Sequence, residues 1–345
     1  MNLIKKIFII TFLLLISLII SNCNLIFYGI EQGAGQIKIL TNAKPIKKFM
    51  QDSLYPDSLK QKLILVEQIK KYTIDSLGLN PSKNYNTLYD QKGKDILWVV
   101  IAAEKYKMKE YLWKFPVLGK LPYKGFFKKH KAINEAEKLK NKGFDSQVST
   151  VSAWSTLGFF KDPILSEMLN RPTGEIARLI IHELTHSTLF IKGDAEFNEN
   201  LATFVGDEGA KQFLIDKYGI KSNYYKEYIG ELIDIENFSA HVLKGAEKLD
   251  SLYNKFPKNI SDIEKDDLKT KLITKIIKDL DTIKFHNNHD FSNLTDSSNI
   301  PNNSFFIGYI TYRKNQNQFY TEFKEKYNSD FKKYLNYLKS KYKSI

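Results

Sequence analysis

The chain has 345 residues, of which 43% are hydrophobic and 26% are charged. This balance excludes a disordered or fibrous protein, and the single cysteine, Cys23, excludes an intrachain disulfide framework and a multi-cysteine metal site. Lysine and arginine outnumber aspartate and glutamate by 52 to 39, which gives a formal net charge of +13. No nucleic-acid-binding motif accompanies this excess, so we expect a solvated basic surface and no nucleic-acid partner.

The N-terminus has the pattern of a secretory signal. Lys5 and Lys6 precede residues 7–20, an uncharged apolar run that is too short to span a bilayer but suits a signal peptide. Cys23 follows, where a bacterial lipoprotein signal places its lipidated residue. We therefore predict a signal peptide over residues 1–22 and an exported protein that is lipid-anchored at Cys23 to the membrane of a bacterial cell envelope. The alternative is an ordinary signal peptide with an incidental cysteine.

The first half of the mature chain predicts a mixture of helices and strands. Residues 24–56 form a lead-in of mixed polar and apolar residues that contains Gly33, Gly35 and two prolines, and residues 57–77 have apolar positions at helical spacing. A short continuous apolar run at 96–103 is typical of a buried strand. Residues 128–142 predict an amphipathic helix, and residues 146–156, rich in Val, Ser and Thr, predict a strand.

The second half is predicted to be helical. Beyond Pro172 the helical pattern continues almost to the C-terminus, with a polar loop at about residues 286–304. No internal repeat and no long linker divides the chain. We therefore predict that residues 23–345 form a single α+β domain that is predominantly helical.

Residues 182–186 read His-Glu-Leu-Thr-His within a predicted helix. His182 and His186 are four residues apart, so both imidazoles project from one face, about one turn from each other, and can share a Zn²⁺ ion. Glu183 lies beside them, where its carboxylate can deprotonate a metal-bound water. The alternative is a pair of surface histidines accompanied by a glutamate.

The third ligand must come from elsewhere in the chain. Three acidic residues follow closely: Asp194, Glu196 and Glu199. If the helix continues to residue 192 and the chain turns at Gly193, five residues of a returning helix bring Glu199 level with His186, whereas the other two acids stay near the turn. We predict Glu199 as the ligand and keep Asp194 as the alternative. Three further residues either orient the imidazoles or are solvated: Asn198, Asp207 and Glu208.

Two segments carry a resemblance to a known family. HELTHSTLFIKGDAEFNENLATFVGDEGA (182–210) and STLGFFKDPIL (155–165) resemble the bacterial putative aminopeptidase family of HExxH metallopeptidases, which are exported lipoproteins of the zincin type. The resemblance implies a zincin-like fold with a small sheet packed on the HExxH helix. It also implies His182, His186 and Glu199 as zinc ligands and Glu183 as the general base.

The chain departs from the better-known glutamate zincins in two respects. Thr203 stands where an acidic residue is expected four positions after the ligand glutamate, and a G-x-M-E-N exopeptidase motif is absent. Both departures weaken the assignment as an aminopeptidase more than the assignment as a peptidase.

A hydrolytic site also needs a hydrogen-bond donor for the oxyanion of the tetrahedral intermediate. We predict Tyr312, which lies in a segment that resembles the C-terminal block of the family, with Tyr309 and Tyr123 as alternatives. An aminopeptidase further needs a carboxylate for the substrate's ammonium group, and three residues are candidates: Asp162, Asp194 and Glu196. The strand predicted at 146–156 either binds the substrate by β-augmentation or is an ordinary buried strand.

Together these patterns predict a membrane-tethered zinc peptidase, an aminopeptidase by family resemblance, that acts on peptide substrates. A non-catalytic surface lipoprotein that uses the same scaffold to bind proteins is the alternative from a different functional class. A closed, purely structural zinc site with a fourth protein ligand is the other alternative.

Overall fold

The computed structural model describes residues 23–115, 119–151, 156, 160–287, 291, 294 and 300–344. The chain divides into two compact units, Met1–Ala43 and Lys44–Ile345. Residues 1–22, to which the signal peptide is assigned, and the side chain of Cys23 lie outside this description. Within it, no helix combines the length and apolar character that a membrane span requires.

Most of the lead-in at 24–56, for which the sequence predicts no secondary structure, is helical. Helix α2 (Cys23–Asn42) occupies the first unit, and α3 (Ile46–Gln51) follows at the start of the second. Helix α2 contains three glycines, which weaken the helical signal in the sequence.

The second unit holds the remaining described elements. The strands are β1 (Lys44–Pro45), β2 (Thr87–Tyr89), β3 (Trp98–Glu104), β4 (Trp113–Phe115), β5 (Gly119–Leu121), β6 (Tyr123–Phe126), β7 (Phe144–Thr150) and β8 (Ile164–Leu165). The α-helices after α3 are α4 (Asp57–Tyr72), α5 (Lys129–Lys140), α6 (Thr173–His186), α7 (Ala195–Tyr218), α8 (Asn223–Asn254), α9 (Asp262–Lys278), α11 (Asn303–Arg313), α12 (Gln316–Tyr327) and α13 (Phe331–Lys341). Short π- or 3₁₀-helical turns are η1 (Thr73–Leu77), η2 (Ser166–Asn170) and η3 (Asp279–Thr282). The fold is α+β and predominantly helical, as predicted.

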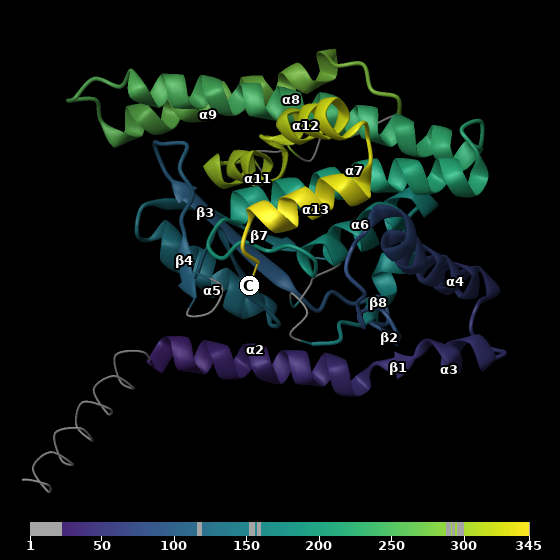
Figure 1. The fold of residues 1–345 in the computed structure, drawn as a ribbon. Helices are drawn as coiled ribbons and strands as arrows, with labels where there is room; N and C mark the ends of the chain where they lie inside the picture. Colours follow the sequence, from purple (N-terminus) through teal and green to yellow (C-terminus); the bar gives the residue numbers. More distant parts are fainter. Residues whose placement is uncertain are drawn as a thin grey trace, which may run out of the picture. The chain divides into compact units, whose positions relative to one another are not determined.

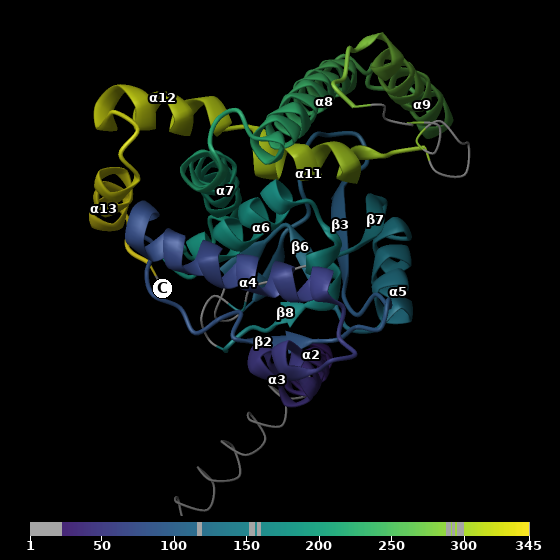
Figure 2. The same ribbon diagram turned by 90° about the vertical axis from the view of Figure 1, so that its right-hand side faces the viewer.

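A small antiparallel sheet forms one wall of the second unit, with strand order β6-β3-β7. The central strand, β3, is the apolar run predicted as a strand, and its residues Val100, Ala102 and Ala103 are fully buried. Strand β7 pairs with β3 along seven residues and forms an edge of the sheet, with α5 beside it (Figure 2). Strand β7 confirms the first part of the strand predicted at 146–156, and most of the remainder lies outside the described residues.

Helices α6 and α7 pack against each other at the centre of the unit (Figure 1). Gly206 permits this close approach, because a Cβ atom there would lie 3.0 Å from the carbonyl oxygen of Arg178 and 3.3 Å from the Cβ atom of His182. Helix α7 also contacts α8, α11 and α12. Most of its residues are buried, so it lacks the one-sided apolar stripe of a surface helix.

The turn between α6 and α7 differs from the expected one. Helix α6 ends at His186 and does not continue to residue 192, and Gly193 adopts a left-handed conformation (φ +78°) before α7 begins. The side chain of Asp194 caps α7, since its Oδ1 accepts a hydrogen bond of 3.1 Å from the backbone N–H of Phe197. This cap fixes the first turn of α7, and Glu199 follows directly after that turn.

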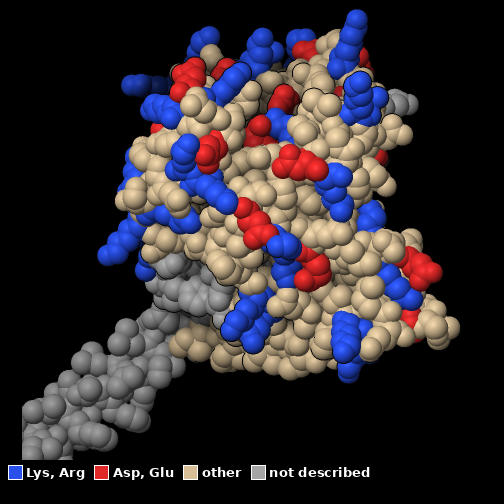
Figure 3. Space-filling view, turned by 45° about the vertical axis from the view of Figure 1, so that its right-hand side comes forward, with Lys and Arg blue, Asp and Glu red and all other residues tan. Residues whose placement is uncertain are grey.

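Long helices cover the rest of the core. Helices α8 and α9 lie side by side, and α11 packs against α8 (Figures 1 and 2). Lysine and arginine side chains are spread among acidic ones on the face shown in Figure 3, without gathering over a single element.

Candidate metal centre

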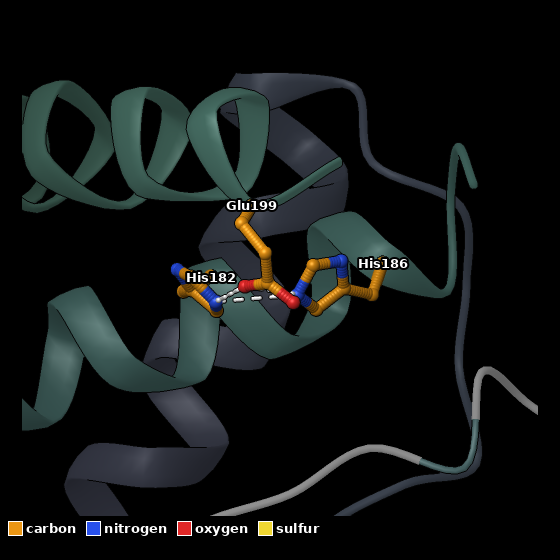
Figure 4. Close-up of side chains that lie close together, drawn as sticks. All are labelled: His182, His186 and Glu199. Carbon is orange, nitrogen blue, oxygen red and sulfur yellow. Dashed lines mark hydrogen bonds and ion pairs between the residues drawn. The ribbon is translucent and has the colours of Figure 1, made fainter. Parts of the chain in front are cut away.

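Helix α6 brings two imidazoles together in its last turn. His182 and His186 project from the same face, and their Nε2 atoms are 3.2 Å apart (Figure 4). The surrounding helix is amphipathic, with Ile176, Ile180 and Leu184 buried in the core. This buried stripe holds the helix so that both histidines face α7.

Glu199 of α7 completes the group from the opposite side. Its Oε2 atom lies 3.5 Å from the Nε2 atoms of both His182 and His186 (Figure 4). Ligands of a tetrahedral ion with bonds of about 2.0–2.1 Å lie roughly 3.3 Å from one another. The observed separations fit that spacing, and two imidazoles with one carboxylate are donors suited to a divalent transition metal. The three residues could therefore hold a metal ion.

The Glu199 carboxylate and the two imidazoles shift one another's pKa values. Burial alone would raise the pKa of Glu199, but the two imidazoles outweigh it and hold this pKa well below its usual range. Burial lowers the pKa of His182. Burial acts in the same direction on His186, but there the Glu199 carboxylate prevails and raises the pKa. An ionised carboxylate thus faces a pair of imidazoles that prefer different protonation states.

Glu183 lies beside this group on α6 and lines the same cavity. Its side chain is buried, and burial raises its pKa to about 7, with further contributions from the carboxylates of Glu199 and Asp162. A carboxyl group with a pKa near neutrality can both accept and donate a proton under physiological conditions.

A cavity of about 590 Å³ opens onto these residues. Residues from β3, β6 and β7 line one wall, and residues from α6, α7 and the end of α11 line the other. It is large enough to take a small ligand or a short stretch of peptide.

Two tyrosines reach the metal centre from different elements. The hydroxyl of Tyr123 donates to Glu199 Oε1 at 3.2 Å, and Tyr312 also lines the cavity. Burial and the Glu199 carboxylate raise the pKa of both phenols well above the ordinary value, so both remain neutral hydrogen-bond donors. Tyr309 packs instead against the hydrophobic cluster of α8, α9 and α11.

The acidic alternatives lie elsewhere. Asp194 caps α7, Glu196 Oε1 accepts a hydrogen bond from Asn315, and Asp162 accepts hydrogen bonds from Thr156. None of the three lines the cavity, as far as the described residues show. Asp162 nevertheless lies near enough to Glu183 for its charge to contribute to the raised pKa of that carboxyl.

The three residues proposed to orient the imidazoles have other partners. Asn198 binds the backbone of Ile191 with both ends of its amide, at 2.8 Å each. Asp207 pairs with Arg313, and Glu208 pairs with Lys211. Each therefore acts on the packing around the site and not directly on an imidazole.

Sequence reasoning missed two arginines that line the cavity, Arg178 and Arg313. The position of Arg178 contains a usable signal, because it precedes His182 by four residues and so shares its helical face. Arg313 has no comparable local signal, since it reaches the site only through the packing of α11 on α7.

A family model described as putative aminopeptidase matches residues 27–343, almost the whole chain. Neither a curated protein nor a solved structure matches the chain.

Proposed function

Because this chain belongs to the putative aminopeptidase family, we propose that it is a zinc-dependent peptidase. The observation that carries the proposal is the convergence of His182, His186 and Glu199 beside Glu183 in one cavity. Two histidines and a glutamate are a known ligand set for catalytic zinc, which keeps a further position for water or substrate.

Each residue has a role that its position supports. His182, His186 and Glu199 would hold the ion. When bound, Zn²⁺ polarises the scissile carbonyl and lowers the pKa of a water molecule. Glu183 takes a proton from the attacking water and passes it to the leaving amine, for which a pKa of about 7 is well matched.

The oxyanion of the tetrahedral intermediate needs a neutral donor. Both phenols line the cavity and both interact with Glu199, but the Tyr123 hydroxyl is the one that donates to Glu199 Oε1 at 3.2 Å, whereas the Glu199 hydrogen bond is the smallest contribution to the raised pKa of Tyr312. We therefore assign oxyanion stabilisation to Tyr312 and orientation of the Glu199 carboxylate to Tyr123.

A peptide substrate would lie along β7, whose residues Ser149 and Thr150 line the cavity. The register pairs Val99 with Ser149, and the N–H of Val151 donates to the carbonyl of Leu97. The main-chain groups of Thr150, between these pairs, therefore point away from β3 toward the open edge. Such groups can pair with an extended peptide by β-augmentation.

We also propose that the protein is exported and anchored to a bacterial membrane by acyl chains on Cys23. The support is the pattern of two lysines, an apolar run and a cysteine at the N-terminus. Loss of Lys5 and Lys6 with the signal peptide would leave a net charge of +11 (13 − 2), which favours contact with anionic headgroups.

The test compares the full-length protein with a Glu183→Gln variant for zinc content and for turnover of a peptide library. We expect the variant to retain zinc and to lose cleavage by about 10²- to 10⁴-fold, because the proton acceptor is gone. Glu196→Gln is the matched control, since Glu196 does not line the cavity. Unchanged cleavage in Glu183→Gln would remove Glu183 from the mechanism. Zinc binding without turnover of any peptide would favour the non-catalytic binding scaffold.

Blocked peptides separate the two kinds of peptidase. If the protein is an aminopeptidase, acetylation of the substrate N-terminus will abolish cleavage. Equal cleavage of free and acetylated peptides would assign it to the endopeptidases.

A further inference from the structure

Two guanidinium groups line the cavity beyond the metal centre. Arg178 lies on α6 one turn before His182, and Arg313 is the last residue of α11, directly after Tyr312. Asp207 pairs with Arg313, and its neighbour Gly206 lies against the Arg178 side chain, since a Cβ atom at Gly206 would be 3.5 Å from Arg178 Cγ. The two cations therefore flank one region of the cavity, adjoining His182.

Both arginines are held by carboxylates that lie outside the cavity. Arg178 Nε and Nη2 donate to Glu175, with the shortest contact at 2.6 Å, and Arg313 Nη1 donates to Asp207 at 2.7 Å. Neither Glu175 nor Asp207 is among the residues that line this cavity. The two carboxylates, which do not line the cavity, thus fix the orientation of the guanidinium groups that do.

Each arginine keeps donors that this arrangement does not use. Arg178 Nη1 and Arg313 Nε and Nη2 have no partner in the part of the chain that the structure describes, and none of them is fully shielded from solvent. The side chains remain 23% and 12% exposed, respectively. Positioned, unpaired guanidinium N–H groups are suited to a planar carboxylate, which they bind through parallel charge-assisted hydrogen bonds.

The other charges of the cavity favour the same kind of ligand. Among its described lining residues the only carboxylates are Glu183 and Glu199, and both belong to the metal centre. No acidic side chain is therefore left over for a cationic group of a substrate, whereas two cationic side chains are available for an anionic one. A bound divalent ion would add further positive charge.

We propose that the cavity recognises a carboxylate of the substrate through Arg178 and Arg313. The carboxylate is either the C-terminal carboxylate of a short peptide or an acidic side chain near the scissile bond. This inference rests on the proposed peptidase function, and it specifies which peptides the site selects.

The first experiment uses matched substrates and the full-length protein. One pair differs only in a C-terminal acid or amide, and a second pair only in an internal Glu or Gln. We expect kcat/KM to be at least tenfold higher for the charged member of one pair, and the pair that shows the preference identifies the source of the carboxylate. Equal kcat/KM within both pairs would overturn the inference.

Variants then test whether the arginines are responsible. Arg313→Gln should reduce the preference at least tenfold, and Lys314→Gln, which removes the neighbouring cation outside this cavity, should leave it intact. Arg313→Gln alone removes the cation that pairs with the Asp207 carboxylate. The double variant Arg313→Gln/Asp207→Asn, which removes both charges, is therefore measured alongside it. A preference that survives in both Arg313 variants would assign the selection to other residues and overturn the inference.

A binding measurement separates this inference from the proposed function. Zinc-loaded Glu183→Gln protein is titrated against fluorescent peptides of the same two pairs, and binding is followed by anisotropy. Tighter binding of the charged member without turnover by the parent protein would uphold the inference and reject the peptidase function. Turnover with equal binding and equal kcat/KM within each pair would support the peptidase function and reject the inference.

Discussion

Asn198 holds the backbone of Ile191 at both of its polar groups. Ile191 N–H donates to Asn198 Oδ1, and Asn198 Nδ2 donates to the carbonyl of Ile191, each at 2.8 Å. These two hydrogen bonds close the turn between α6 and α7 and fix the residue at which α7 starts. Because Glu199 is the next residue, Asn198 governs the position of the proposed third ligand.

Replacing Asn198 should therefore weaken both the fold and metal binding. Asn198→Ala leaves the half-buried N–H of Ile191 without its partner, whereas the Ile191 carbonyl still accepts from the backbone N–H of Asp194 at 3.3 Å. We expect the substitution to lower the free energy of unfolding by about 1–2 kcal/mol. Zinc affinity should fall as well, as measured by competition with a chelating dye. Asn254→Ala, at an exposed position in α8, is the control and should change stability by less than about 0.5 kcal/mol. Unaltered zinc affinity in Asn198→Ala would contradict the positioning role.

Substitutions of the two tyrosines at the metal centre should affect different properties of the protein. Tyr312→Phe removes the proposed oxyanion donor, so kcat should fall about 10²- to 10³-fold while zinc content stays the same. Tyr123→Phe removes the hydroxyl that donates to Glu199 Oε1, so zinc affinity should fall by about 10- to 100-fold. Tyr309→Phe, in the hydrophobic cluster, serves as the control for both measurements. The opposite distribution of effects would exchange the roles of Tyr123 and Tyr312.

Zinc uptake should depend on pH and release protons. Burial by itself lowers the pKa of His186, but the Glu199 carboxylate outweighs burial and raises it. The metal-free protein therefore keeps a proton on this imidazole at pH values where an unperturbed histidine has lost it, and zinc must displace that proton. Affinity should thus fall as the pH decreases through the raised pKa. Titration calorimetry in buffers of different ionisation enthalpy measures the released protons, and a pH-independent affinity between about pH 6 and 8 would refute this linkage.

A methyl group at Gly206 should strain the contact between α6 and α7. A Cβ atom there meets the Arg178 carbonyl at 3.0 Å and the His182 Cβ at 3.3 Å, so Gly206→Ala must push α7 away from α6. We expect a loss of about 1–3 kcal/mol in the free energy of unfolding, together with weaker zinc binding. Gly308→Ala on α11 meets nothing within 4 Å and should be neutral or stabilising by up to about 1 kcal/mol. Equal effects of the two substitutions in chemical denaturation would argue against a tight helix contact at Gly206.

The sequence predicted elements whose signals are local. The helices at 57–77 and 128–142 and the strand at 96–103 are confirmed, because each shows its own apolar pattern. The C-terminal end of α6 could not be predicted from a local pattern, since the sequence of residues 187–192 is compatible with a continuing helix. The chain leaves the helix there because distant groups bind it: Thr188 Oγ1 accepts from Asn80 N–H, and Asn198 holds Ile191.

The prediction that Glu199 faces the histidines came from an incorrect turn. The expected turn lay at Gly193–Asp194 after a longer helix, whereas the actual one begins at Ser187, and the distance recovered by the returning helix is correspondingly different. An acidic residue in the first turns of α7 can reach the histidines with the expected turn and with the observed one. The prediction therefore identified Glu199 although the turn was wrong. Arg313 was missed because α11 reaches the cavity only through tertiary packing.

Helix α7 is enclosed by other helices along most of its length, and Glu199 is carried near its start. An enclosed helix has few low-energy local openings, so its buried backbone amides should be among the slowest in the unit to exchange with deuterium. Glu199, near the start of this helix, would then keep its position relative to α6 whether or not an ion is bound.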